Sequence, residues 1–173
     1  MIYVPIVRRA PGFGVISRMQ LQSSITTRLE YQHKSLLDLI EGLSDEQVRQ
    51  QANLGKWSIF ENIVHLTTYQ NTFMSRVEEI LKNDQPSFER YTAETDPLFY
   101  DNCVKSTREI IQELMADRKI LATRLLSLKE EQFKRTGRHP VFGTMTLIQW
   151  IHFFLLHEAH HLFTIFKLAA SFR

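Results

Sequence analysis

The fold is decided by residues 150–161, which read WIHFFLLHEAHH. Large apolar residues without glycine or proline favour one long helix through this stretch. On an α-helix, residues four apart lie about 5–6 Å from each other on one face, so His157 and His161 can offer their imidazoles to one point. This is the spacing of histidine ligands to a metal ion. The apolar neighbours of the pair indicate that it faces a packed interior.

A histidine pair alone does not establish a metal site, because two buried histidines can equally be hydrogen-bonded core residues. A metal site usually needs three or four protein ligands. The best candidate for a third is His65, in the second turn of a helix predicted from residue 59 to residue 81. The alternative for His65 is an ordinary core histidine. We interpret His33, in the first predicted helix, as a boundary or surface residue.

The composition is typical of one mostly helical domain. The chain has 173 residues, of which 43% are hydrophobic, with six glycines and five prolines. We expect residues 1–18 to form an irregular N-terminal arm and residues 19–173 to form the domain, with Met19 as an alternative start. A formal net charge of +2 does not indicate binding to nucleic acid or to a membrane surface. The single cysteine, Cys103, excludes a disulfide framework and a thiolate cluster.

No stretch of the sequence has the pattern of a signal peptide or the length of a membrane span, so we expect a cytoplasmic protein. Hydrophobic periodicity predicts four long helices and no credible strand. Ser44, Ser58 and Thr146 are predicted helix caps. Residues 83–97 form a long connection, either functional or a crossover between distant corners of the bundle. The predicted ranges of the long helices are 19–43, 59–81, 101–128 and from 147 onward.

These elements predict an all-α four-helix bundle with short extra helices in the loops. In such bundles, sites are built in the core from facing helices, so His65 could meet His157 and His161. Three neutral imidazoles leave a fourth position for water or substrate, the open arrangement of a catalytic metal site. The basic residues 129–144 are predicted to be a solvated loop or, alternatively, an anion-binding rim beside that site.

Three motifs together resemble the DinB/YfiT-like superfamily. They are the segments 55–66 (GKWSIFENIVHL), 138–143 (RHPVFG) and 157–161 (HEAHH). The resemblance implies a four-helix bundle that binds a divalent metal, zinc or nickel, through His65, His157 and His161. It also implies activities such as metal-dependent transfer of a low-molecular-weight thiol, bacillithiol for example. The commonest family ending, Arg-Gly-Gln after the last histidine, is replaced here by Leu162-Phe163-Thr164, so a contact of that arginine with substrate is not expected.

Two other functions remain open from the sequence. Residues 157–161 also fit His-Glu-x-x-His, the zinc protease signature in which glutamate is the general base. A bundle of this kind could instead bind metal without catalysis. We expect a small-molecule substrate and a homodimer, with neither nucleic acid nor a membrane as a partner. Glu158 and His160 are predicted to lie off the metal side of the helix, and Glu61 and Tyr69 are candidates for acid–base roles near His65.

Overall fold

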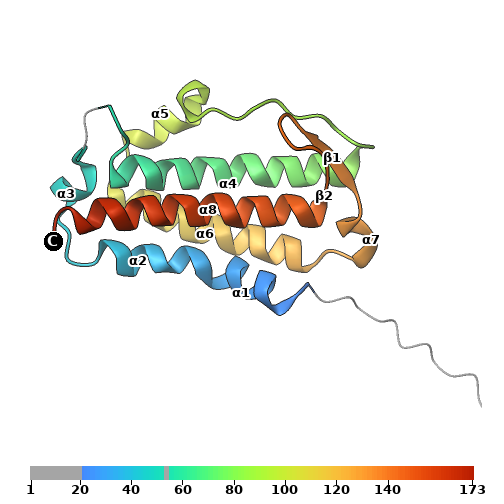
Figure 1. The fold of residues 1–173 in the computed structure, drawn as a ribbon, viewed down its shortest axis with the longest axis horizontal. Helices are drawn as coiled ribbons and strands as arrows, with labels where there is room; N and C mark the ends of the chain where they lie inside the picture. Colours follow the sequence, from blue (N-terminus) through green and yellow to red (C-terminus); the bar gives the residue numbers. More distant parts are fainter. Residues whose placement is uncertain (1–20, 53–54) are drawn as a thin grey trace, which may run out of the picture.

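The computed structural model describes residues 21–52 and 55–173, so the predicted irregular arm of residues 1–18 lies outside the described part. The described residues form a bundle of four helical segments (Figure 1). The prediction of an all-α four-helix bundle is therefore confirmed. The first segment consists of α1 (Ser23–Tyr31), the 3-10 turn η1 (Gln32–Lys34) and α2 (Ser35–Ile40), and the others are α4 (Ile59–Lys82), α6 (Thr107–Leu126) and α8 (Leu147–Ala170).

Two of the predicted long helices are divided. The 3-10 turn η1 interrupts the first and buries His33, so the interpretation of His33 as a boundary or surface residue is wrong. The predicted helix 101–128 is two helices, α5 (Pro97–Cys103) and α6, because Ser106 starts a new helix by capping it. The Ser106 hydroxyl accepts the Glu109 N–H at 3.3 Å, and the Glu109 carboxylate accepts the Ser106 N–H at 2.8 Å.

Short helices in the loops and the predicted caps are both present. The extra helices are α3 (Asp45–Arg49), the 3-10 turn η2 (Ala93–Thr95) and α7 (Glu130–Phe133). Ser44, Ser58 and Thr146 cap α3, α4 and α8, each in a reciprocal pair with the residue three positions later. These side chains satisfy backbone N–H groups that the first turn of a helix leaves without partners.

The prediction that the chain contains no strand is wrong. Strands β1 (Thr136–His139) and β2 (Gly143–Thr146) pair antiparallel, with Thr136 opposite Thr146. Each strand has four residues, so the alternation of side chains is too short to stand out in the sequence. Gly137 lets the hairpin pack closely on the end of α4, since a Cβ atom there would lie only 2.8 Å from a side-chain carbon of Ile80.

The four long segments do not simply alternate in direction. In Figure 1, α4 and α6 both run from left to right, whereas the α1–α2 segment and α8 run from right to left. Because α4 and α6 are neighbours and parallel, the chain between them must return along the bundle. Residues 83–106 make this return across the outside of α4, so the predicted connection is a crossover.

The crossover is attached to the hairpin at its start. The Phe88 N–H donates to the Arg138 carbonyl at 3.1 Å, and the Arg138 N–H donates to the Pro86 carbonyl at 2.8 Å. These bonds extend the hairpin by one isolated parallel bridge between Ser87 and Arg138. The start of the crossover and the hairpin are therefore held together beside the end of α4.

A buried polar network joins all four helical segments inside the apolar core. Arg118 of α6 forms an ion pair with Glu158 of α8, and both side chains are 2% exposed or less. Gln70 of α4 accepts a hydrogen bond from Arg118 Nε at 2.6 Å, and Gln32 of η1 donates to Glu158 Oε2 at 2.8 Å. Every partner in this network comes from a different segment, so the network fixes their relative positions.

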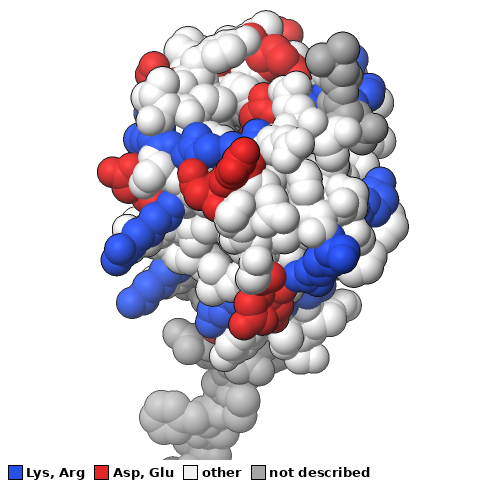
Figure 2. Space-filling model, turned by 90° about the vertical axis from the view of Figure 1, so that its left-hand side faces the viewer, with Lys and Arg blue, Asp and Glu red and all other residues white. Residues whose placement is uncertain are grey.

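The surface carries charges of both signs. On the end of the molecule shown in Figure 2, lysine and arginine side chains lie beside aspartate and glutamate on a largely uncharged surface. The balanced totals of 21 basic and 19 acidic residues agree with this appearance. Across residues 21–52 and 55–173, no helix combines the length with the apolar character that crossing a membrane requires.

Candidate metal centre

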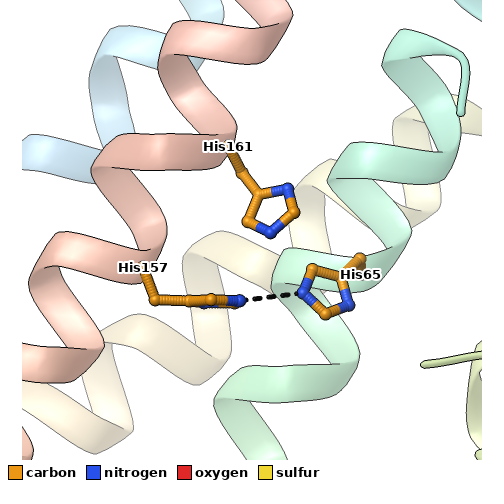
Figure 3. A group of neighbouring side chains, drawn as sticks. All are labelled: His65, His157 and His161. Atoms are coloured by element: carbon orange, nitrogen blue, oxygen red, sulfur yellow. Dashed lines mark hydrogen bonds between the residues drawn. The ribbon is translucent and has the colours of Figure 1, made fainter. Parts of the chain in front are cut away.

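Helices α4 and α8 are antiparallel neighbours, and they bring the three predicted histidines together. The cap at Ser58 fixes the start of α4: its hydroxyl accepts the Glu61 N–H at 3.1 Å, and the Glu61 carboxylate accepts the Ser58 N–H at 2.6 Å. His65 follows in the second turn. His157 and His161 project from α8 toward it, one helical turn apart (Figure 3).

The distances between the rings suit a single small cation. The potential ligand atoms of the three histidines all lie within 4.8 Å of one another, and Nε2 of His65 is 3.0 Å from Nε2 of His157. Two nitrogens bound to one zinc ion at about 2.0–2.1 Å in tetrahedral geometry are roughly 3.3 Å apart. The Nδ1 atoms of His65 and His157 are buried and have no hydrogen-bond partner among the described residues. The described residues thus leave two buried nitrogens of this cluster without a hydrogen-bond partner.

All three imidazoles are neutral at physiological pH. Burial, and then the neighbouring histidines, lowers the pKa of His65, His157 and His161 to about 3 in each case. Only a neutral imidazole has the lone pair that binds a metal ion. The fold therefore presents three lone-pair donors at neutral pH without first removing a proton, which fits a divalent cation.

Asn62 determines which nitrogen of His161 is free. The Asn62 amide nitrogen donates to the Ser58 carbonyl at 2.8 Å, and this fixes the orientation of the amide. Its oxygen then lies 2.9 Å from Nδ1 of His161 and can only accept, so Nδ1 carries the hydrogen. Nε2 of His161 is left with the lone pair, directed toward the other two rings.

Replacing Asn62 with alanine is expected to weaken zinc or nickel binding about tenfold, because hydrogen-bond partners of ligand histidines usually contribute 10–100-fold to metal affinity. Competition with a chromophoric chelator measures this. The matched control is Asn71→Ala, which removes an exposed asparagine of the same helix. Equal metal affinity of the Asn62→Ala variant and the unaltered chain would show that Asn62 does not orient His161.

A cavity of about 600 Å³ opens beside the three histidines. The aromatic rings of Trp57, Tyr69 and Phe153 form part of its wall, and the ring centre of Tyr69 is 4.2 Å from that of His157. Arg76 of α4, residues 90–94 of the crossover and residues 139–141 of the hairpin complete the lining. A molecule of metabolite size can therefore reach the cluster from this side.

The other residues that the sequence marks as candidates differ in their position relative to the cavity. Tyr69 is buried in the cavity wall, whereas the Glu61 carboxylate is used in the cap of α4. His160 is exposed on α8, off the cluster as predicted. Cys103 lies on α5 outside the cavity lining, and burial raises the pKa of its thiol. Part of the segment 129–144 borders the cavity, and in that part His139 is buried.

Sequence reasoning missed several groups around the cavity. Arg76 and Tyr91 were not singled out, and Asn62 appeared only within the motif at residues 55–66. Asn62 could have been found from its spacing, because it precedes His65 by three residues and lies on the same face of α4. Arg76 also follows the helical period from His65. Tyr91 has no such signal, since it lies on the irregular crossover.

Glu158 does not face the cavity. It forms the buried pair with Arg118, about 100° around α8 from His157, and is not among the residues that line the cavity. A general base must be within hydrogen-bond reach of the molecule it deprotonates. Residues 157–161 match the protease signature in sequence only. Glu158 is directed into the core, so it is not placed to act as the general base.

Several solved structures have a similar fold. YfiT from Bacillus subtilis, described as a probable metal-dependent hydrolase with an unusual four-helix bundle topology, superposes with a TM-score of 0.75 at 21% identity, covering 98% of this chain and 93% of YfiT. TT2238, a four-helix bundle protein, superposes with a TM-score of 0.60 at 18% identity over 82% of this chain and 95% of its own. An uncharacterized protein from Clostridium difficile 630 superposes with a TM-score of 0.62 at 10% identity, covering 86% of this chain and 92% of that protein.

Similarity in sequence agrees with the similarity in fold. The uncharacterized protein YuaE of Bacillus subtilis (strain 168) is 30% identical over 138 residues, covering 71% of this chain and 83% of YuaE. The model of the DinB superfamily matches residues 28–165, which contain all three histidines and both helices that carry them. The family match, the relative in sequence and the bundle fold agree. The chain therefore belongs to the DinB superfamily.

Proposed function

We propose that this chain is a divalent-metal-dependent enzyme that transfers a low-molecular-weight thiol to a soft electrophile. The observation that supports this most is the placement of three neutral histidines in the wall of a cavity of about 600 Å³. Three protein ligands leave one side of a bound ion open, as in catalytic rather than structural sites. The three histidines line the cavity, so a substrate that enters it could reach an ion held by them.

The ligand set suits zinc or nickel, since imidazole nitrogen is a good ligand for both. A divalent ion held by His65, His157 and His161 would supply Lewis acidity to a thiol or water molecule that enters from the cavity. YfiT is described as a probable metal-dependent hydrolase. Hydrolysis is therefore the second candidate function for this chain, with water in place of the thiol.

The residues of the chain would position the reactants and keep water away. In the transfer, the thiol loses its proton to solvent, a carbon–sulfur bond forms at the electrophile, and the leaving group departs with the electron pair of the broken bond. Burial raises the pKa of Tyr69 to about 12, so its hydroxyl keeps its hydrogen and can donate it in a hydrogen bond. Trp57 and Phe153 provide the apolar wall that excludes solvent.

Metal-loaded protein is expected to accelerate thiol transfer at least tenfold over metal-stripped protein. The assay combines bacillithiol, glutathione or cysteine with a chromogenic aryl halide, and it follows the released product. Alanine in place of His157 or His161 should reduce the rate to that of metal-stripped protein, because each removes a ligand lone pair. His160→Ala is the matched control, since His160 is exposed on the same helix.

Two results would contradict thiol transfer. Equal rates with loaded and stripped protein across the thiol panel would favour a bundle that binds metal without catalysis. Metal-dependent cleavage of ester or amide substrates, with no product of thiol transfer, would favour the hydrolase. The helical circular dichroism of each preparation verifies that the protein is folded in both comparisons.

A further inference from the structure

The cavity contains a second polar region, farther along α4 from the histidine cluster. Arg76 lines it and is only 8% exposed. Its guanidinium donates from Nη2 to the Glu89 carbonyl at 2.9 Å, and it also lies close enough to the Tyr69 hydroxyl to lower the pKa of that group. Among the described residues it forms no ion pair with a carboxylate. A buried guanidinium is costly unless it is paired, so Arg76 has donors available for an anion.

His139 supplies another donor in the same region. Its Nδ1 accepts the backbone N–H groups of Val141 at 3.1 Å and Phe142 at 3.2 Å. Burial, and then the charge of Arg76, lowers the pKa of His139, so the ring is neutral with its hydrogen on Nε2. Trp150 lies against both groups: its ring centre is 5.7 Å from the Arg76 guanidinium carbon and 5.2 Å from the His139 ring centre.

The spacing along α4 sets the size of a ligand that reaches both regions. Arg76 follows His65 by eleven residues, about 16 Å along the axis and close to three complete turns, so both lie on one face. Helical side chains lean toward the N-terminus, and Arg76 is near enough to Tyr69 to influence its pKa. The guanidinium therefore reaches back toward the cluster. A ligand touching both ends is on the order of 10 Å long, the length of about three amino-acid residues.

We infer that Arg76 and His139 form a carboxylate-binding subsite that selects an extended, anionic thiol as the substrate. This inference rests on the proposed thiol transfer, because it places the sulfur atom at the three histidines. A guanidinium binds a carboxylate through two parallel hydrogen bonds, and the His139 N–H can add a third. Both side chains act by positioning the thiol, since they lie away from the reacting atoms.

The test uses protein loaded with Co²⁺, whose absorption reports a bound thiolate. Glutathione and its diethyl ester are titrated separately, because they share one thiol and differ in their carboxylates. The unaltered chain should bind glutathione at least tenfold more tightly than the ester. Arg76→Gln should remove this preference by weakening glutathione alone, Arg76→Lys should keep part of it, and His139→Gln should reduce it less. Arg108→Gln, an exposed arginine of α6, is the control.

A second titration separates the subsite from the thiol chemistry. S-methylglutathione keeps the carboxylates but has no thiol, and calorimetry measures its binding to metal-free protein. Binding that depends on Arg76, together with no thiolate absorption from glutathione, would support the subsite and refute thiol transfer. Equal affinity for glutathione and its ester, or a preference that survives Arg76→Gln, would overturn the subsite while leaving thiol transfer in place. Unchanged Co²⁺ stoichiometry and melting temperature verify that each variant is folded.

Discussion

Replacing His65 with alanine is expected to weaken the binding of zinc or nickel by on the order of 100- to 1000-fold. Structural zinc sites contribute roughly 10–16 kcal/mol, which is about 2.5–5 kcal/mol for each ligand when it is divided among three or four. His65 is the single ligand candidate on α4, and its Nε2 lies 3.0 Å from that of His157. Without it, His157 and His161 remain as a two-ligand pair on one helix, and solvent must supply the other ligands.

Competition with a chelator measures the affinity, and metal analysis of the dialysed protein measures the stoichiometry. The unaltered chain should retain about one ion per chain. His152→Ala and His160→Ala remove exposed histidines of α8 and should leave both values unchanged. The helical circular dichroism of the His65 variant should also be preserved, because the apolar packing of α4 does not depend on the imidazole. Undiminished metal binding by His65→Ala would refute the three-histidine site.

The part of the site carried by long helices could be predicted from the sequence. His157 and His161 are one turn apart, and the caps at Ser58 and Thr146 indicate where α4 and α8 begin. A periodic apolar pattern fixes which face of each helix is buried, and therefore which histidines are directed inward. The structure brings the predicted histidines together because two regular helices in a bundle leave few alternatives for their relative placement.

The parts carried by irregular segments could not be predicted. Strands of four residues have too few alternations to recognise, so the sequence predicts a loop or rim where the structure has the hairpin with His139. The crossover residues near Tyr91 follow no period, and their position depends on backbone bonds to Arg138. His33 was misplaced for a related reason, since the 3-10 turn shifts its side chain relative to a continuous helix.

Glu158 shows how sequence neighbours on a helix can have separate roles. It is adjacent to His157, yet the helical rotation of about 100° per residue directs it into the core rather than into the cavity. There it accepts hydrogen bonds from Arg118 and Gln32, and its side chain is 1% exposed. The ion pair and the three histidines therefore depend on one helix, and the ion pair fixes the rotation of α8 that presents His157 and His161 to His65.

The Glu158→Ala substitution is expected to lower the free energy of unfolding by about 3–5 kcal/mol, because it leaves the Arg118 guanidinium buried without an anion. The corresponding fall in melting temperature is roughly 10 °C for a chain of this size. Urea unfolding of the metal-free protein measures the effect without a contribution from metal binding. The matched control is Glu78→Ala, which breaks the partly exposed pair with Arg124, where a loss of at most about 1 kcal/mol is expected.

A double variant separates the charge from the packing. Arg118→Met combined with Glu158→Leu replaces both charges with apolar side chains, and buried ion pairs replaced in this way often cost little stability. The double variant should therefore be more stable than Glu158→Ala, although it alters more atoms. Its metal affinity should fall nonetheless if the ion pair positions α8, because apolar side chains do not reproduce the bonds to Gln32 and Gln70. A loss below 1 kcal/mol in Glu158→Ala, or a double variant less stable than that single variant, would show that the ion pair does not hold the bundle in this arrangement.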